Sequence, residues 1–177
     1  MAAQCATEVD DNPLWNFALA FYASKDVQQL LLTLQNEHQQ DTLLVLAALW
    51  LAQQQQPWQL TRTQLDAYHH WREHVIHSLR QARKAIDKHS PNEHQRALRQ
   101  QLQQDEIRAE QLALHQLWQL HQSINQHQPM HQHQHLPQQE HLQLRLQNLY
   151  GQATLEPLSE TKKEALRPLF LALSERL

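Results

Sequence analysis

The chain has 177 residues, with 14 His, five Trp, a single Gly and a formal net charge of −3. This length is enough for one domain with a sizeable core, and a single glycine excludes a fold built on many tight β turns. The charge balance leaves no overall basic footprint for nucleic acid or for an anionic membrane. Because good helix formers dominate and β-branched residues are scarce, the composition predicts an all-α protein.

The chain is expected to begin with a short tail, followed by a capped helix. Residues 1–11 predict a flexible acidic tail, and residues 12–125 predict a helical domain. Asn12 is placed to cap the first helix, with Pro13 at the first helical position, where its missing N–H costs nothing.

Two further caps follow. Asp26 is placed to cap a second helix, and Asp41 is placed to cap a third. The third helix contains the run Leu43–Ala52, which is apolar nearly all round and is therefore expected at the centre of the domain. The segment Gln53–Pro57 is expected to end it.

A long antiparallel helical hairpin is predicted next. Apolar residues at helical spacing predict one helix from Thr61 to about Lys88. A break at Ser90 and Pro91 precedes a second long helix that runs to about Ile124. Asp105 falls on the predicted inward stripe of this second helix, where we expect it to pair with a basic residue across the hairpin.

The last part of the chain predicts a linker and two more helices. Residues 126–139 are rich in His and Gln, contain two prolines and predict a flexible linker. Residues 140–177 predict C-terminal helices that pack on the same domain, with Gly151 ending the first and Ser159 capping the last. We therefore expect the chain to form a helical bundle of about six to seven helices.

Four segments carry a family resemblance. They read NPLWNFALAFY, LLLTLQNEHQQDTLLVLAALWLA, WREHVIHSLRQARKAI and LQQDEIRAEQLAL, in this order. The order, and above all the NPLWxFxLxxY pattern from Asn12 to Tyr22, resembles an uncharacterised proteobacterial family of small all-helical cytoplasmic proteins, a domain of unknown function. The resemblance covers residues 12–114. It implies the fold and brings no established activity.

Histidines on the predicted long helix suggest a metal site. His70, Glu73 and His74 match the H-x-x-E-H pattern, in which two His on one helix face share a zinc and the Glu acts as base. His77 adds an imidazole one turn further on. The alternative is coincidence in a chain with 14 His, since no recognisable ligand follows downstream. We favour coincidence over a metal site here, and among the functional interpretations we favour metal capture over zinc catalysis.

A second histidine group lies in the predicted linker. It consists of His127, His131, His133 and His135. Flexible His tracts capture nickel or zinc weakly, and compositional drift toward Gln and His is the competing explanation.

Basic residues gather toward the predicted hairpin tip. Arg80, Arg83, Lys84 and Lys88 could contact RNA phosphates. An ordinary solvated helix face explains them as well, and we favour that explanation.

The corner after the third helix is the predicted partner-binding surface. Trp58 follows Pro57, and Leu60 and Leu65 extend the corner. A rigid corner that carries an aromatic residue loses little entropy on binding, and Trp is a common interface anchor. The competing explanation is that Trp58 folds back over the third helix.

These observations predict a non-enzymatic helical interaction or accessory protein that acts through an unidentified protein partner. An RNA- or ribosome-associated binding module, and a His-rich metal-binding protein or zinc hydrolase, are the alternatives. No cofactor is required by the sequence. The apolar run Leu43–Ala52 is about half the roughly 20 residues of a membrane span, and Cys5 is the only cysteine. We therefore expect a cytoplasmic protein with no membrane partner.

Overall fold

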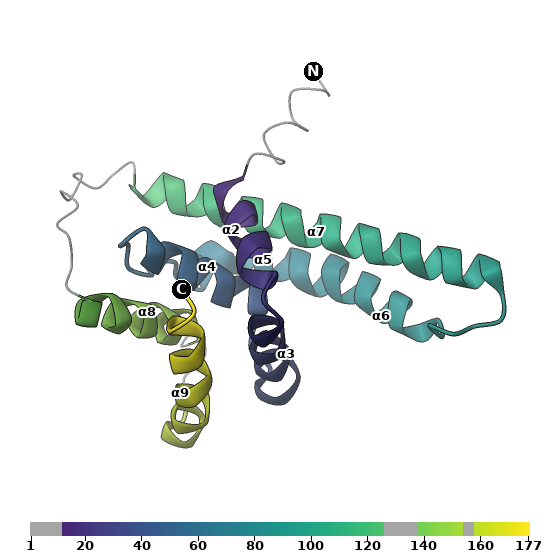
Figure 1. The fold of residues 1–177 in the computed structure, drawn as a ribbon. Helices are drawn as coiled ribbons and strands as arrows, with labels where there is room; N and C mark the ends of the chain where they lie inside the picture. The colour runs from purple at the N-terminus through teal and green to yellow at the C-terminus, as the bar shows by residue number, and fades with distance from the viewer. Residues whose placement is uncertain (1–11, 126–137, 154–157) are drawn as a thin grey trace.

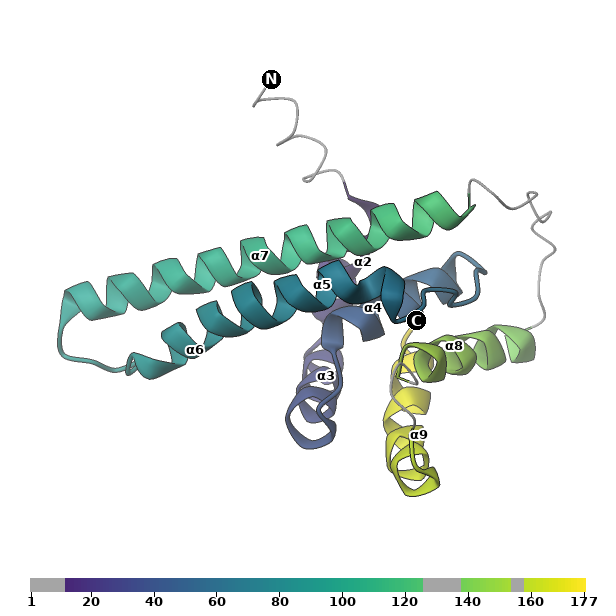
Figure 2. The same cartoon turned by 180° about the vertical axis from the view of Figure 1, so that it is seen from behind.

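The computed structural model describes residues 12–125, 138–153 and 158–177 (Figures 1 and 2). Every regular element in these ranges is helical, which confirms the predicted all-α class. None of the described helices combines the length and the apolar character that a membrane crossing requires. The predicted acidic tail, and most of the predicted linker with His131, His133 and His135, lie outside the described residues.

The first two helices begin with different caps. Helix α2 (Pro13–Tyr22) begins as predicted, because the Asn12 side chain accepts a hydrogen bond from the Leu14 N–H at 2.9 Å. Helix α3 (Lys25–His38) has Ser24 at its N-cap, so the predicted cap at Asp26 is wrong. Asp26 lies in the first turn instead, where a negative charge is favourable near the positive end of the helix dipole.

Helix α4 (Thr42–Gln53) is the central helix of the bundle. Asp41 caps it, since its Oδ1 accepts a hydrogen bond from the Leu43 N–H at 3.1 Å. Every residue of the run Leu43–Ala52 is buried, and α4 packs against α2, α3, α7 and α8. The predicted central position is therefore confirmed.

The predicted long helix is continuous but irregular. It ends at Ala85, earlier than the predicted Lys88, because the Ile86 backbone is extended. The π-helical turn inside it holds one extra residue per turn and shifts the register between its two halves. The parts are a 3₁₀ turn (Thr63–Leu65), α5 (Asp66–Trp71), the π-helical turn (Arg72–Ile76) and α6 (His77–Ala85).

Helix α7 (Glu93–Asn125) is the longest element and runs back along α6. Both views show the α6–α7 hairpin extending away from the other helices, as predicted (Figures 1 and 2). The end of α7 agrees with the predicted end near Ile124.

Two C-terminal helices complete the described chain. Helix α8 (Gln138–Ala153) packs on α4, and α9 (Glu160–Ser174) packs on α3 and α8. The Ser159 hydroxyl caps α9 by accepting a hydrogen bond from the Lys162 N–H at 3.2 Å. Residues of α8 and α9 join the same apolar core as α4.

Asn148 on α8 ties this helix to the end of α4. It is fully buried, and its Nδ2 donates hydrogen bonds to the carbonyl oxygens of Ala48 at 3.2 Å and Gln56 at 2.8 Å. Its Oδ1 accepts a hydrogen bond from the Trp58 N–H at 2.8 Å. One side chain therefore bridges α8, α4 and the segment that follows α4.

Gly151 does not end a helix, contrary to the prediction. It lies inside α8, where an added Cβ would stand 3.3 Å from the Cβ and Cδ1 atoms of Trp58. The glycine therefore serves the close approach of α8 to this indole ring.

Candidate interaction groove

A groove of about 610 Å³ lies between α2, α3, α6 and α7, with residues of α4 in its lining. Five large hydrophobic side chains are exposed among the described residues, and four of them line this groove. They are Leu19, Tyr22, Leu32 and Ile107, with exposed fractions of 53, 41, 41 and 45%. The fifth is Leu98, further along α7. Clustered exposed apolar side chains mark interaction sites, whereas scattered ones carry no such meaning.

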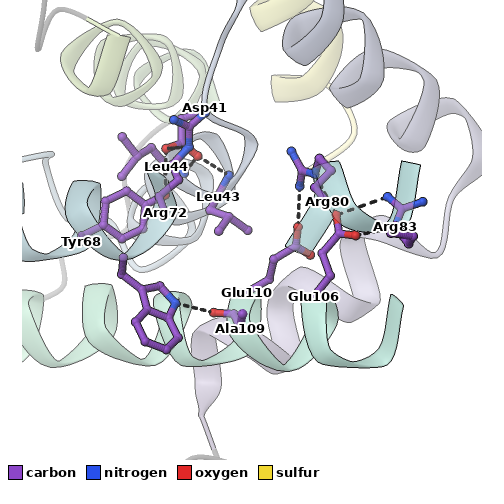
Figure 3. Close-up of polar contacts among 11 residues, drawn as sticks. Asp41, Leu43, Leu44, Tyr68, Arg72, Arg80, Arg83, Glu106, Ala109 and Glu110 are labelled. Atoms are coloured by element: carbon purple, nitrogen blue, oxygen red, sulfur yellow. Dashed lines mark hydrogen bonds and ion pairs between the residues drawn. The ribbon is translucent and has the colours of Figure 1, made fainter. Parts of the chain in front are cut away.

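Paired charges form the polar side of the groove. Figure 3 shows Arg80 and Arg83 of α6 reaching Glu106 and Glu110 of α7. Arg80 Nε lies 2.7 Å from Glu106 Oε1, and Arg80 Nη2 lies 2.7 Å from Glu110 Oε1. Arg83 binds Glu106 through both Nε, at 2.5 Å from Oε2, and Nη2, at 3.3 Å from Oε1. Glu106 is therefore held by two guanidinium groups at once.

The two glutamates respond differently to this environment. Burial alone would raise the pKa of Glu106, but its hydrogen bonds to Arg83 and Arg80 outweigh burial and hold that pKa below its usual value. Burial raises the pKa of Glu110, and Arg80 opposes this only in part. The groove therefore contains one firmly ionised carboxylate and one that takes up a proton more easily.

A second polar network lies beside the groove at the start of α4. The Oδ2 atom of Asp41 accepts hydrogen bonds from the Tyr68 hydroxyl at 2.9 Å and from Arg72 Nε at 2.7 Å (Figure 3). The π-helical turn places Arg72 toward Asp41, while Trp71 just before it donates from Nε1 to the Ala109 carbonyl at 3.0 Å. Asp41 therefore caps α4 and also holds the long irregular helix against it, through Tyr68 and Arg72.

The predicted partner-binding corner lies elsewhere and is covered. Trp58 is half-buried, and its Nε1 donates to the Leu60 carbonyl at 3.1 Å. Leu60 and Leu65 are 5% and 0% exposed. Together with the contacts of Trp58 to Asn148 and Gly151, this burial gives the corner an internal packing role. In this conformation neither leucine is accessible to a partner.

The predicted basic patch divides into paired and unpaired cations. Arg80 and Arg83 are held by the glutamates of α7. Lys84 and Lys88 are exposed, and neither pairs with a carboxylate in the described parts of the chain. The patch is therefore less cationic than the sequence indicates.

The histidines of the H-x-x-E-H pattern lie on the surface. The His70 and His74 rings stand side by side with centroids 4.4 Å apart, and both residues are exposed. Glu73 does not turn toward that pair, because its Oε2 contacts His77 Nδ1 at 2.9 Å. Among the described residues, no group of three or more His, Cys, Asp or Glu is arranged to hold a metal ion.

The chain was compared with known protein families. A family model described as a protein of unknown function (DUF2390) matches residues 13–117. The chain belongs to this family. The matched range contains every residue that lines the groove, whereas α8 and α9 lie outside it. Neither a curated protein nor a solved structure matches the chain.

The groove was not among the sites that the sequence predicted. Its apolar residues resemble core positions in the sequence, and one signal sets them apart. In α2 the large apolar residues spread over about 200°, more than half of the helix circumference, at roughly 100° per residue; they are Leu14, Trp15, Phe17, Leu19, Phe21 and Tyr22. A helix that packs on one side needs a narrower stripe, so this width indicates a second contact surface.

Proposed function

We propose that this member of the family is a helical adaptor that binds a partner protein through the groove, and that the occupant is an amphipathic helix with acidic residues beside its apolar face. The observation that supports the proposal most is the gathering of Leu19, Tyr22, Leu32 and Ile107 on one groove. Burial of such side chains by a partner is favourable at about 25 cal/mol per Å² of apolar surface.

The shape of the site favours a helix as occupant. The groove is bounded by two pairs of helices, α2 with α3 and α6 with α7. An amphipathic helix laid in such a groove presents residues i, i+3, i+4 and i+7 to it. Its volume of about 610 Å³ accommodates several side chains of that face.

The charge of the site favours acidic residues on the occupant. Three cations line the groove, Arg80, Arg83 and Lys84, against two carboxylates, Glu106 and Glu110. Since the pKa of Glu110 is raised, its negative charge is the easier of the two to lose. The unpaired Lys84 is therefore the cation placed to meet a carboxylate of the partner.

The test is site-specific photo-crosslinking in the native cell. A photoreactive residue replaces Ile107 in the groove. The control replaces Gln101, which is exposed, does not line the groove and lies about 120° around α7 from Ile107. The segment captured at position 107 is sequenced. The expected segment has apolar residues at helical spacing and flanking Asp or Glu, and position 101 does not capture it.

Three outcomes contradict the proposal. Equal capture at positions 107 and 101 would remove the groove as the site. A captured segment without amphipathic spacing would remove the helical occupant. A crosslink between two copies of this chain would replace the adaptor with a self-associating protein.

A further inference from the structure

The tip of the hairpin is the place where α6 ends and α7 begins (Figures 1 and 2). A further recess is formed there by side chains of both helices and of the loop between them. It has a volume of about 380 Å³. Its lining consists of four cations and two amides, namely Arg83, Lys88, Arg96, Arg99, Gln100 and Gln103. We call it the tip pocket. No carboxylate is part of this lining.

The arginines of the tip pocket are held in place by the end of α6. Backbone carbonyls at a helix C-terminus lack partners inside the helix. Arg99 Nη1 donates to two carbonyls at the end of α6: that of Arg83, which also accepts from the Ile86 N–H, and, at 2.9 Å, that of Ile86. Arg96 Nη1 donates to the Ser90 carbonyl at 2.7 Å. These guanidinium groups are therefore positioned before any ligand arrives, which lowers the entropic cost of binding.

Donors remain available at these positions. In the described parts of the chain, Nε and Nη2 of Arg96 and of Arg99 have no hydrogen-bond partner, and neither has Nζ of Lys88. Only the charge of Arg83 is compensated, by Glu106. Three positive charges thus share a small concave site without a neutralising acid in its lining.

We propose that the tip pocket binds a small oxyanion of the phosphate class. A guanidinium group matches the oxygens of a phosphate through paired hydrogen bonds. A ligand with a single carboxylate carries one negative charge and would leave two of the three uncompensated positive charges unmatched. Phosphate and pyrophosphate carry several negative charges and match more of these cations. The ligand class therefore follows from the number of cations as well as from their type.

The lining argues against a nucleic acid as the ligand. Binding of single strands relies on aromatic side chains on which bases stack. The tip pocket contains none. The formal net charge of −3 also lacks the overall positive charge that is typical of proteins that bind a nucleic-acid backbone.

The tip pocket can be tested separately from the groove. The two share Arg83 and Gln103, but Lys88, Arg96 and Arg99 line only the tip pocket. Lys88→Gln is the informative variant, because Lys88 is exposed and its side chain forms no hydrogen bond or ion pair in the described parts of the chain. Lys162→Gln is the control, since Lys162 is an exposed lysine at the start of α9.

The experiment is a titration of the full chain with inorganic pyrophosphate, followed by calorimetry and by backbone amide shifts. Saturable binding is expected, with the largest shifts between residues 83 and 103. Lys88→Gln weakens binding roughly tenfold, the loss expected for one charge-assisted hydrogen bond, and Lys162→Gln does not. Acetate at equal ionic strength is the carboxylate probe and gives no saturable shift.

Each remaining outcome overturns the proposal. Absence of saturable pyrophosphate binding removes the site. Equal weakening in the two lysine variants, or equal binding of acetate, reduces it to general ionic attraction. A single-stranded RNA oligonucleotide that binds and is not displaced by pyrophosphate replaces the small oxyanion with nucleic acid.

Discussion

Two apolar surfaces of the protein contrast, and the difference lies in what covers them. The corner at Trp58 is covered from within the chain, because Asn148 and Gly151 of α8 contact it. The groove holds the exposed side chains of Leu19 and Ile107, and nothing described in the chain covers them. The proline, the tryptophan and the two leucines of the corner would form a binding surface only if no distant segment of the chain packed against them.

The contrast shows that the exposure of an apolar side chain depends on segments that are far away in the sequence. Trp58 and Asn148 are 90 residues apart in the chain, and their hydrogen bond joins the family-matched region to a helix outside it. The groove lies wholly inside the matched region. The corner therefore contributes to stability, and the groove is the site that we propose for partner binding; the predictions below separate these roles.

The largest expected effect is at the corner. Trp58→Ala should lower the free energy of unfolding by about 3–4 kcal/mol, because it leaves a cavity against α8 and loses the hydrogen bond from Nε1. Urea denaturation measures the change. Capture of the groove partner should persist in this variant under native conditions. Unchanged stability with lost capture would return the corner to the role of interface.

Low pH should destabilise the folded chain through His121, which hydrogen-bonds to the segment that precedes the corner. His121 is 3% exposed, its ring meets Trp50 edge-on at 6.0 Å between centroids, and its Nε2 hydrogen-bonds with Gln56. Burial lowers the pKa of His121 from 6.5 to about 4. The unfolded chain therefore takes up this proton first, so stability is complete above the unfolded pKa and is lost as the pH falls from 6.5 toward 4.

The size of the acid effect is about 2–3 kcal/mol over that window. It is measured as the fall in unfolding free energy between neutral pH and the lower end of the window, in the wild-type chain and in His121→Gln. The raised pKa of Glu110 acts in the opposite direction, because the folded state then binds a proton more readily. The difference between the two chains isolates His121, and an identical slope in both would contradict the assignment.

A smaller loss is expected from the charged pairs of the groove. Glu106→Gln removes a carboxylate that two arginines share. Arg83 loses its carboxylate partner and Arg80 keeps only Glu110, so we expect a loss of about 1–2 kcal/mol. Asp105→Asn is the matched control, because Asp105 is the exposed neighbour and, in the described parts of the chain, its side chain hydrogen-bonds only with Gln101, one turn away. Thermal unfolding of both variants tests this. Equal effects would mean that the pairs with Arg80 and Arg83 contribute nothing.

The same two residues show where sequence reasoning reached its limit. The inward stripe of α7 predicts that Asp105 pairs across the hairpin, whereas Glu106 does so and Asp105 is exposed. The inward side of a helix depends on where its neighbour lies. Glu106 shares the buried side of α7 with Ala109, Ala113 and Leu117, and Asp105 lies one residue off that stripe.

Local signals predicted the fold well. Asn12, Asp41 and Ser159 cap helices as expected, because a cap needs only its own side chain and the next few N–H groups. The central α4 followed from a run with no polar face. Gly151 was misplaced because its role is contact with Trp58, a residue far away in the sequence. The groove was missed for the same reason, since exposure of Leu19 depends on which helices pack around it.

The smallest effect on stability, and the sharpest test of the comparison, is expected in the groove itself. Leu19→Ser and Ile107→Ser replace side chains that are already about half exposed, so the free energy of unfolding should change by no more than about 0.5 kcal/mol. Binding of the captured segment should nevertheless fall strongly, because that segment would bury these side chains. Leu98→Ser is the control, since Leu98 is 54% exposed on α7 but does not line the groove, and it should change neither quantity. If Ile107→Ser instead lost as much stability as Trp58→Ala, the groove would be filled by the protein's own chain, and the two surfaces would no longer differ in kind.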